Sequence, residues 1–518
     1  MKRRTFVKNV SFSSITIPFM FNNLKWEAVQ NKLFDYSRSA EDRVLILIRL
    51  NGGNDGLNTL IPLDQYDNLM IQRPNVLIPQ GFIIPITDTN GLHPSMTGVA
   101  SMFNDGKVSV IQNVGYPEQN RSHFRSLDIW SYGSTNQEIS TGWMGRYLDS
   151  VYPGYPENYP NEENPDPFAI SMGYEVSTTC QGVMSNFSHT VPNPHDDINV
   201  GNGTALNDGT YYGSHMEYLS TIIAQTNAYG TRVKQAADQG NSTSSLYDMN
   251  NPLSVHMSYI AKMISGGLKT KIYVVNINGF DTHAEQVDSS DTTVGNHAKL
   301  LKTLSDAVKS FQDDIKLQGL EHRVVGMTFS EFGRQIASNA SFGTDHGDAA
   351  PLFLFGTCIS SQIIGPNPVI SDQIQNQAGL NMQIDFRDVY ASVIKDWFGV
   401  DENAVQSLFD YPVNFYTVLQ GCSAGINEEI KKKSLAAIVY PNPCVNTAHL
   451  KFSCLNEKVQ IILNDSYGKT IKELFSKELK AGVHHVELET KSLSEGTYFV
   501  IINKKSKNEE IKIIKRNH

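Results

Sequence analysis

Residues 44–60 read Val-Leu-Ile-Leu-Ile-Arg-Leu-Asn-Gly-Gly-Asn-Asp-Gly-Leu-Asn-Thr-Leu, an apolar run that leads into a glycine-rich turn. The unbroken run from Val44 to Ile48 predicts a strand buried on both faces, as in the middle of a parallel sheet. Asp55 would then lie just past the carboxyl end of a central strand, where open α/β sheets bind their ligands. An ordinary turn explains the same residues equally well. The G-x-G-x-x-G spacing of a dinucleotide site is absent.

The composition limits the class of protein. A chain of 518 residues is too long for one ordinary domain, and 40% hydrophobic residues are enough for a core. The net charge of −10 argues against a nucleic-acid-binding protein, and no stretch is long and apolar enough for a transmembrane segment. The five cysteines form no C-x-x-C pair, and their odd number leaves at least one unpaired within the chain.

Strand-like and helix-like segments alternate along the chain. Further apolar runs that predict strands are residues 107–111, 271–277, 322–329 and 351–356. Segments that predict helices lie between them, at residues 95–106, 253–266, 296–315 and 385–398. This alternation predicts an α/β domain over residues 41–425, with a mostly parallel central sheet flanked by helices. Residues 151–250 are rich in Asn, Pro, Gly, Ser and Tyr, and they predict an insertion with short elements that forms a lid or a substrate-selecting cap.

Metal-ligand residue types follow several of the predicted strands. Asp281 and His283 come just after the strand at 271–277, and Glu331 follows the strand at 322–329. Asp345 and His346 lie in a glycine-flanked loop. Converging carboxylates repel one another unless a cation neutralises them. With Asp55, these residues predict a divalent metal site with oxygen and nitrogen ligands, which favours zinc or manganese over calcium.

Residues 120–126, Asn-Arg-Ser-His-Phe-Arg-Ser, are the candidate catalytic segment. Ser122 lies close in sequence to Arg121 and Arg125, and guanidinium groups bind phosphate-like oxyanions in a bidentate manner. Ser122 could therefore be a nucleophile or a ligand. The alternative is that Ser122 caps the helix that follows it.

The chain begins Met1-Lys2-Arg3-Arg4-Thr5-Phe6-Val7-Lys8, which resembles a twin-arginine export signal. Residues 1–40 are therefore set apart as a signal and linker. The alternative is an ordinary basic N-terminus. Export implies a secreted or cell-surface protein that passes through the periplasm.

Five motifs carry a family resemblance. They are residues 50–59, residues 120–126, Phe280-Asp281-Thr282-His283, Ser330-Glu331-Phe332-Gly333-Arg334 and Gly343-Thr344-Asp345-His346-Gly347. Over about residues 40–420, the chain resembles the DUF1501 family, which is similar to the alkaline phosphatase and sulfatase superfamily. The resemblance implies that Asp55, the Asp281–His283 pair and His346 with Asp345 bind metal. It places Ser122 in the region of the nucleophile and Glu331 where an Asp-His pair is usual, and both positions depart from the superfamily pattern.

Residues 436–518 predict a separate small β-sandwich of short strands. They open with Tyr440-Pro441-Asn442-Pro443, and they include Gly496-Thr497-Tyr498 and a lysine-rich final strand. This module resembles the C-terminal sorting domain of the type IX secretion system of Bacteroidetes. The resemblance implies the secretion machinery as a partner. The alternative is a carbohydrate-binding or adhesion sandwich.

Two functions are compatible with these residues. The first is a secreted metal-dependent hydrolase of phosphate or sulfate esters, in which Ser122 or water is the nucleophile and Arg121 or Arg125 holds the oxyanion. The second is a non-catalytic surface or binding protein that retains the fold. Metal-dependent turnover would distinguish the two.

Overall fold

The computed structural model describes residues 42–201, 210–359, 361–419 and, with short gaps, 438–516. The twin-arginine-like segment predicted at the start of the chain lies outside these residues. The chain divides into two compact units, residues 1–424 and 425–518, and each is described by itself.

The larger unit is built on a nine-stranded sheet with the order β11-β5-β10-β9-β1-β8-β6-β7, in which β12 also pairs with β5. Its strands are β1 (Val44–Asn51), β5 (Val108–Gly115), β6 (Ala169–Met172), β7 (Ser188–Val191), β8 (Ile272–Asn278), β9 (Val324–Ser330), β10 (Ala350–Phe355), β11 (Gln362–Ile364) and β12 (Ile384–Asp385). β1 lies inside the sheet and runs parallel to β8 and β9. Its residues 44–48 are all buried, as the apolar run predicted.

Among the described residues of this sheet, β10 is the one strand that runs antiparallel to its neighbours. It pairs antiparallel with both β5 and β9, whereas the other pairings are parallel. The amino end of β10 therefore lies at the edge where β1, β5, β8 and β9 have their carboxyl ends. Loops from five strands meet at this edge.

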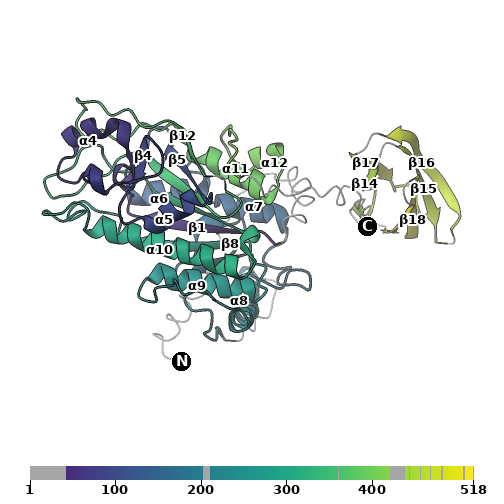
Figure 1. Ribbon diagram of the computed structural model, residues 1–518. Helices are drawn as coiled ribbons and strands as arrows, with labels where there is room; N and C mark the ends of the chain where they lie inside the picture. Colours follow the sequence, from purple (N-terminus) through teal and green to yellow (C-terminus); the bar gives the residue numbers. More distant parts are fainter. Residues whose placement is uncertain are drawn as a thin grey trace. The chain divides into compact units, whose positions relative to one another are not determined.

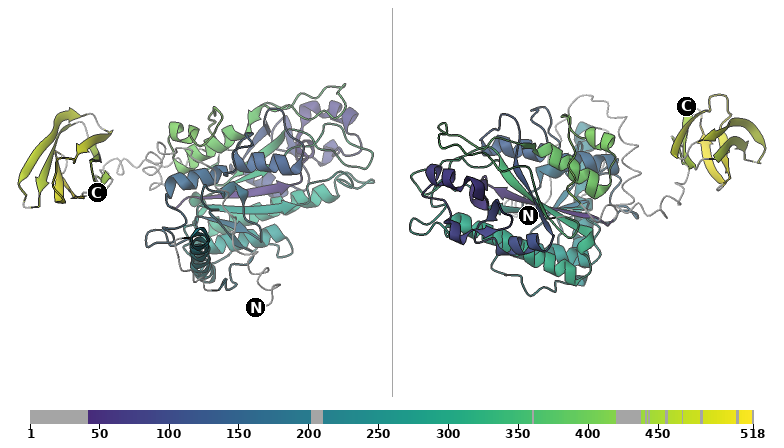
Figure 2. Two further views of the ribbon diagram at one scale, coloured as in Figure 1. Left: turned by 180° about the vertical axis from the view of Figure 1, so that it is seen from behind. Right: turned by 45° about the horizontal axis from the view of Figure 1, so that its top comes forward.

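Helices cover both faces of the sheet (Figures 1 and 2). One face packs against α5 (Thr97–Asn104), α9 (Pro252–Ser265) and α10 (Asn296–Leu317), and α8 (Tyr211–Gln239) packs against α9. The other face packs against α6 (His123–Tyr132), α7 (Trp143–Val151), α11 (Phe386–Phe398) and α12 (Glu402–Gln406). The side chains of β1 alternate between the two cores, as expected for a strand. This arrangement confirms the predicted mixed α/β sheet flanked by helices.

The part of the chain between β1 and α5 forms a separate three-stranded sheet. It consists of β2 (Leu60–Pro62), β4 (Asn90–Leu92) and β3 (Ile84–Pro85) in that order. The same region contains two short helices, α3 (Gly56–Thr59) and α4 (Tyr66–Gln72), and two 3-10 turns, η2 (Leu63–Gln65) and η3 (Gln80–Phe82). Two further 3-10 turns are η4 (Thr178–Cys180) and η5 (Glu321–Arg323).

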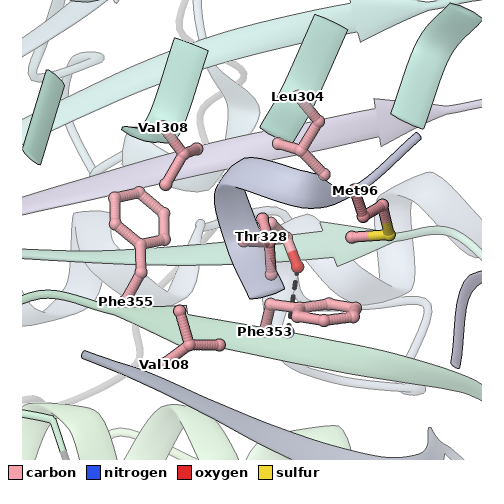
Figure 3. Close-up of a pocket in the computed structure, with 8 residues that line it drawn as sticks. Met96, Val108, Leu304, Val308, Thr328, Phe353 and Phe355 are labelled. Atoms are coloured by element: carbon pink, nitrogen blue, oxygen red, sulfur yellow. Dashed lines mark hydrogen bonds between the residues drawn. The ribbon is translucent and has the colours of Figure 1, made fainter. Parts of the chain in front are cut away.

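The core under α10 is packed almost without voids. Figure 3 shows a cavity of about 10 Å³, with Leu304 and Val308 of α10 on one side and Phe353 and Phe355 of β10 on the other. The Phe353 N–H donates to Thr328 Oγ1 over 3.0 Å, so the polar groups beside the cavity are paired. A space this small holds no ligand.

Residues 151–250 contain short elements, as the sequence predicted, and they also contribute to the central sheet. They supply β6 and β7 to the central sheet and also the 29-residue helix α8. The two strands are four residues each, and polar residues such as Ser188 and His189 are buried within β7. Beyond the short elements, the polar composition did not indicate the long helix α8.

The smaller unit contains two antiparallel sheets, with the orders β13-β14-β17 and β16-β15-β18-β19. Its strands are β13 (Ile438–Tyr440), β14 (Thr447–Cys454), β15 (Glu457–Asp465), β16 (Thr470–Leu479), β17 (Gly482–Glu489), β18 (Gly496–Lys504) and β19 (Glu509–Lys515). Leu450 from one sheet and Ile461 and Ile502 from the other belong to a single buried core. The predicted all-β sandwich is confirmed.

Cys358 is disulfide-bonded, and Cys180, Cys444 and Cys454 are buried and form no disulfide in the described part of the chain. In the described part of the chain, no helix has the length and apolar character needed to cross a membrane.

Candidate metal centre

Metal-ligand side chains gather at the sheet edge where the loops from five strands meet. Asp281 and His283 follow β8, and Glu331 follows β9 directly. His123 is the first residue of α6, which comes after β5. His346 precedes β10, and the antiparallel direction of that strand brings it to the same edge.

Three imidazole rings and one carboxylate converge there. His283 Nε2 and His346 Nε2 are 2.9 Å apart, and they lie 3.2 Å and 3.1 Å from Asp281 Oδ1. His123 Nε2 lies 3.4 Å from Asp281 Oδ2. Ligand atoms of His123, Asp281 and His346 all lie within 4.8 Å of one another. Nitrogen and oxygen donors in this combination form zinc and manganese sites in proteins.

Each of the three histidines has an acceptor for its other ring nitrogen. His123 Nδ1 lies 2.9 Å from Glu331 Oε1, and His283 Nδ1 lies 2.7 Å from Asp345 Oδ1. His346 Nδ1 lies 2.9 Å from the carbonyl oxygen of Arg121. These oxygens only accept, so Nδ1 is the donor in each ring. Metal-binding histidines in proteins are oriented by hydrogen bonds of this kind.

The positions of the protons on the histidine rings show whether a cation fits the site. With Nδ1 protonated, a neutral ring presents an unshared electron pair at Nε2. His283 and His346 then point two such pairs at each other over 2.9 Å. A metal ion or an extra proton removes that repulsion, and Asp281 supplies a negative charge beside both rings. The four side chains therefore fit a divalent cation.

The site is open to solvent. The side chains of Asp281 and His283 are 45% and 44% exposed, and that of His123 is 35% exposed. Structural zinc sites are closed, whereas catalytic sites keep one position for water or substrate. This exposure leaves the group accessible to a ligand from solvent.

The buried side chain of Arg334 donates hydrogen bonds to three loops of the site and so holds them together. Its side chain is fully buried, and it donates to the carbonyl oxygens of Gly52, Gly53, Phe280 and Thr344 and to Asp281 Oδ1. Burial raises the pKa of Asp281, but the hydrogen bond and charge of Arg334 outweigh it, with the neighbouring imidazoles acting in the same direction, and bring the pKa to about 2. Asp281 is therefore ionised at neutral pH.

The histidines have different environments. The hydrogen bond to Glu331 raises the pKa of His123, with Asp281 acting in the same direction. Burial lowers the pKa of His346, although the neighbouring Asp281 carboxylate, which favours the protonated ring, opposes this. Phe332 contributes to the burial, since its ring packs on both imidazoles with centroid distances of 5.0 Å and 4.6 Å.

Gly52 allows the loops after β1 and β8 to touch. Its φ is +118°, and a Cβ there would lie 2.1 Å from the backbone nitrogen of Asp281. The Gly52 N–H donates to Glu331 Oε1 over 2.8 Å. The glycine of the opening motif thus helps to position Glu331, the acceptor for His123 Nδ1.

The structure brings together Asp281, His283 and His346, three of the residues that the sequence predicted as metal ligands. It places Glu331 and Asp345 one layer further out, as acceptors for histidine Nδ1 atoms. Asp55 is not part of the group. Its side chain is 1% exposed, and its oxygens accept from Arg73 over 2.9 and 2.8 Å and from Gln286 over 2.6 Å.

The predicted catalytic segment has a mixed outcome. Ser122 is exposed at the N-cap position of α6, and its side chain makes no capping hydrogen bond. The Arg121 guanidinium makes a bidentate ion pair with Asp348 over 2.8 and 2.7 Å. Arg125 donates to the carbonyl oxygen of Thr135. Neither guanidinium is directed at the histidine group by these contacts.

His123 and Arg334 were missed as site residues, although both lie in the quoted motifs. His123 immediately follows Ser122, and its position after the predicted strand at 107–111 indicates a place at the ligand edge of the sheet. Arg334 comes three residues after Glu331, but its buried position cannot be inferred from sequence spacing.

Two family matches cover parts of the chain. Residues 212–409 match the family described as "Protein of unknown function (DUF1501)". Residues 438–516 match the "Secretion system C-terminal sorting domain", which indicates a secreted or cell-surface protein that interacts with the secretion machinery. No curated protein matches the sequence.

Several solved structures are similar to the chain. A protein of the alkaline phosphatase superfamily from Vibrio parahaemolyticus is 10% identical, covers 93% of this chain and 92% of its own, and has a TM-score of 0.32. The PsFucS1 sulfatase from Pseudoalteromonas sp. is 10% identical, with coverage of 92% and 90% and a TM-score of 0.32.

The surface component PorZ of the type IX secretion system of Porphyromonas gingivalis is 18% identical over 19% of this chain, with a TM-score of 0.13. This chain spans 14% of that protein's length. Likenesses this weak say nothing about chemistry, for which the side chains above are the basis. The matched residues confirm both resemblances predicted from the motifs: the chain carries a DUF1501 segment at residues 212–409 and a secretion system C-terminal sorting domain at residues 438–516.

Proposed function

We propose that this protein is a secreted, metal-dependent hydrolase of phosphate or sulfate esters. The observation that carries the proposal is the group of three imidazoles around Asp281, each with its Nδ1 bound to an acceptor and its Nε2 turned toward the carboxylate. The sorting domain supports a role outside the cell.

His123, Asp281, His283 and His346 would hold the metal. Three imidazoles and one carboxylate favour zinc, and manganese accepts the same donors. When bound, such an ion polarises an ester oxygen and lowers the pKa of a coordinated water. Glu331 and Asp345 would keep His123 and His283 oriented, a function that supports metal affinity in known sites.

The N-terminus of α6 would receive the oxyanion of the substrate. Helix N-termini carry unpaired N–H groups and a partial positive charge, which favour phosphate-like groups. The helix has ten residues, and the Ser122 side chain does not cap it. Ser122 is exposed next to His123, so it or a water molecule would be the nucleophile.

Arg121 takes a different role from the one first predicted. Its guanidinium pairs with Asp348, and its carbonyl oxygen accepts from His346 Nδ1. It therefore links the loop that carries His123 to the loop that carries His346. We assign it to positioning and not to oxyanion binding.

One observation favours the rival, a non-catalytic secreted binding protein. Among the described residues, no hydrogen bond joins Ser122 Oγ to a histidine or carboxylate that would act as its base. A water nucleophile does not need that contact. Only a measurement of activity therefore distinguishes the binding protein from the hydrolase.

The test is a turnover assay with aryl phosphate and aryl sulfate esters on the full chain. We expect hydrolysis that a chelator abolishes and that zinc or manganese restores. Asp281→Ala should remove it, whereas His195→Ala should not, because His195 pairs with Asp238 away from this group. Metal uptake without hydrolysis of either ester class would favour the binding protein.

A further inference from the structure

A second charged group lies near the metal centre, on the sheet face covered by α6 and α7. Arg49 is on β1, beside Asn276 of β8 and Phe329 of β9. Side chains alternate along a strand, so Arg49 lies on the same face of β1 as Leu45 and Leu47. These two leucines pack in the core that contains Ile129 and Trp130 of α6. Its side chain is 14% exposed.

Arg49 lacks the hydrogen bonds that a buried guanidinium requires. Its Nε is buried and has no partner among the described residues. In the described part of the chain, Arg49 forms an ion pair with Glu175 over 3.6 Å, and the side chain of Glu175 is 76% exposed. A guanidinium presents five N–H donors, and burying them without acceptors is costly. An acceptor from outside the chain would satisfy the buried Nε.

Arg49 interacts electrostatically with Glu331, which orients a histidine of the candidate metal centre. Burial lowers the pKa of Arg49, and the charge of Glu331 opposes this most strongly. Glu331 Oε1 is committed to Gly52 N and His123 Nδ1, while Glu331 Oε2 is buried without a partner in the described chain. Arg49 lies opposite Phe329 in the register of β1 and β9, and Phe329 is two residues before Glu331, so the guanidinium and the carboxylate that orients His123 come from neighbouring positions of adjacent strands.

We propose that Arg49 binds the tetrahedral oxyanion of the substrate, a phosphate or sulfate group, beside the metal centre. This proposal deepens the proposed function and rests on it. The planar fork of arginine suits two oxygens of such a group. The other nearby guanidiniums are occupied, since Arg121 pairs with Asp348 and Arg334 with Asp281 and backbone carbonyls.

The probes are inorganic phosphate and sulfate, titrated calorimetrically into the metal-loaded full chain. We expect Arg49→Gln to weaken anion binding at least about tenfold, since a charge-assisted hydrogen bond is lost. Its metal content should stay at the wild-type level. Arg49→Lys keeps the charge but not the fork, and it should lose part of the affinity.

Arg323→Gln is the matched control. Arg323 precedes β9, at the opposite end from Glu331, and it should leave anion binding unchanged. Equal anion affinity in Arg49→Gln and wild type would overturn the proposal, and would leave Arg49 paired with Glu331 through water. Absence of metal in the wild type would instead overturn the proposed function, while the comparison of variants still decides the role of Arg49.

Discussion

At the scale of single residues, the centre depends on which ring nitrogen of each histidine carries its proton. Carboxylate oxygens of Glu331 and Asp345 and one carbonyl oxygen fix that choice. Loss of such outer partners typically costs 10–100-fold in metal affinity. We therefore expect Asp345→Ala to weaken metal binding by about that factor, because His283 loses its orientation.

The measurement is a competition titration against a chelator of known affinity. Asp345→Asn serves as the control, since its amide oxygen can still accept from His283 Nδ1. Wild-type affinity in Asp345→Ala would mean that His283 is not a ligand or needs no orienting partner.

Gly52 leads to a prediction about strain. Gly52→Ala would place a Cβ 2.1 Å from the nitrogen of Asp281 at a φ of +118°, so the two loops must separate. Gly106→Ala is the control, because its φ is +78° and nothing lies within 4 Å. We expect about 1–2 kcal/mol of destabilisation at Gly106 from the backbone conformation alone. Gly52→Ala should cost more and should also lower metal affinity, as shown by urea unfolding and metal titration. Equal effects in both variants would contradict the close approach.

Part of the site could be predicted from the sequence, because polar residues that directly follow an apolar run lie at the end of a strand. Asp281 and His283 follow an apolar run, so their place at a strand end was readable. Asp55 satisfied the same rule but was misjudged, because its partner Arg73 comes from a short helix whose position no pattern indicated. His123 was not predicted, because the sequence alone does not distinguish it from the neighbouring hydroxyl of Ser122 as the functional group.

At the scale of elements, the direction of β10 decides whether His346 joins the site. The apolar run at 351–356 predicted a strand, but alternating or continuous apolar patterns are the same in both directions. Antiparallel pairing with β5 and β9 puts the residues before β10 at the ligand edge. A parallel strand would have placed them at the other end of the sheet. Pairing direction comes from tertiary packing, which the sequence pattern does not contain.

The buried Asp55–Arg73 pair connects the loop after β1 to the end of α4. Both side chains are at most 1% exposed. Removing one partner from such a pair typically costs about 3–5 kcal/mol, because the other charge stays buried. We expect Arg73→Met to lower the free energy of unfolding by about that amount in urea titrations.

The control for this pair is Arg232→Met. Arg232 is 41% exposed, and its partner Asp166 also accepts from the Lys269 N–H, so the loss should be about 1 kcal/mol or less. A small effect at Arg73 would show that Asp55 is not held by the pair, and its role as a ligand would have to be reconsidered.

At the scale of the whole molecule, buried neutral histidines should make the larger unit sensitive to acid. Burial lowers the pKa of His93 to about 3 and that of His189 and His297 to about 4. An unfolded histidine titrates near about pH 6.5. Between these values the unfolded chain binds protons that the native unit does not, so the free energy of unfolding falls as pH falls. Each histidine contributes up to about 1.4 kcal/mol per pH unit in this range.

Urea unfolding between pH 7 and 4.5, with a chelator present, measures this dependence. His189→Leu should reduce the slope by about one proton, since its ring is fully buried and its Nε2 has no partner among the described residues. Stability that does not change below pH 6.5 would contradict the neutral state of these histidines.

The most direct measurement is elemental analysis of the purified full chain together with His283→Ala, His346→Ala and His195→Ala. The proposed metal centre predicts about one zinc or manganese per chain in the wild type and in His195→Ala, and a loss of metal in the other two variants. Absence of bound metal in the wild type, with no thermal shift when zinc or manganese is added, would contradict the metal centre and with it the proposed hydrolase.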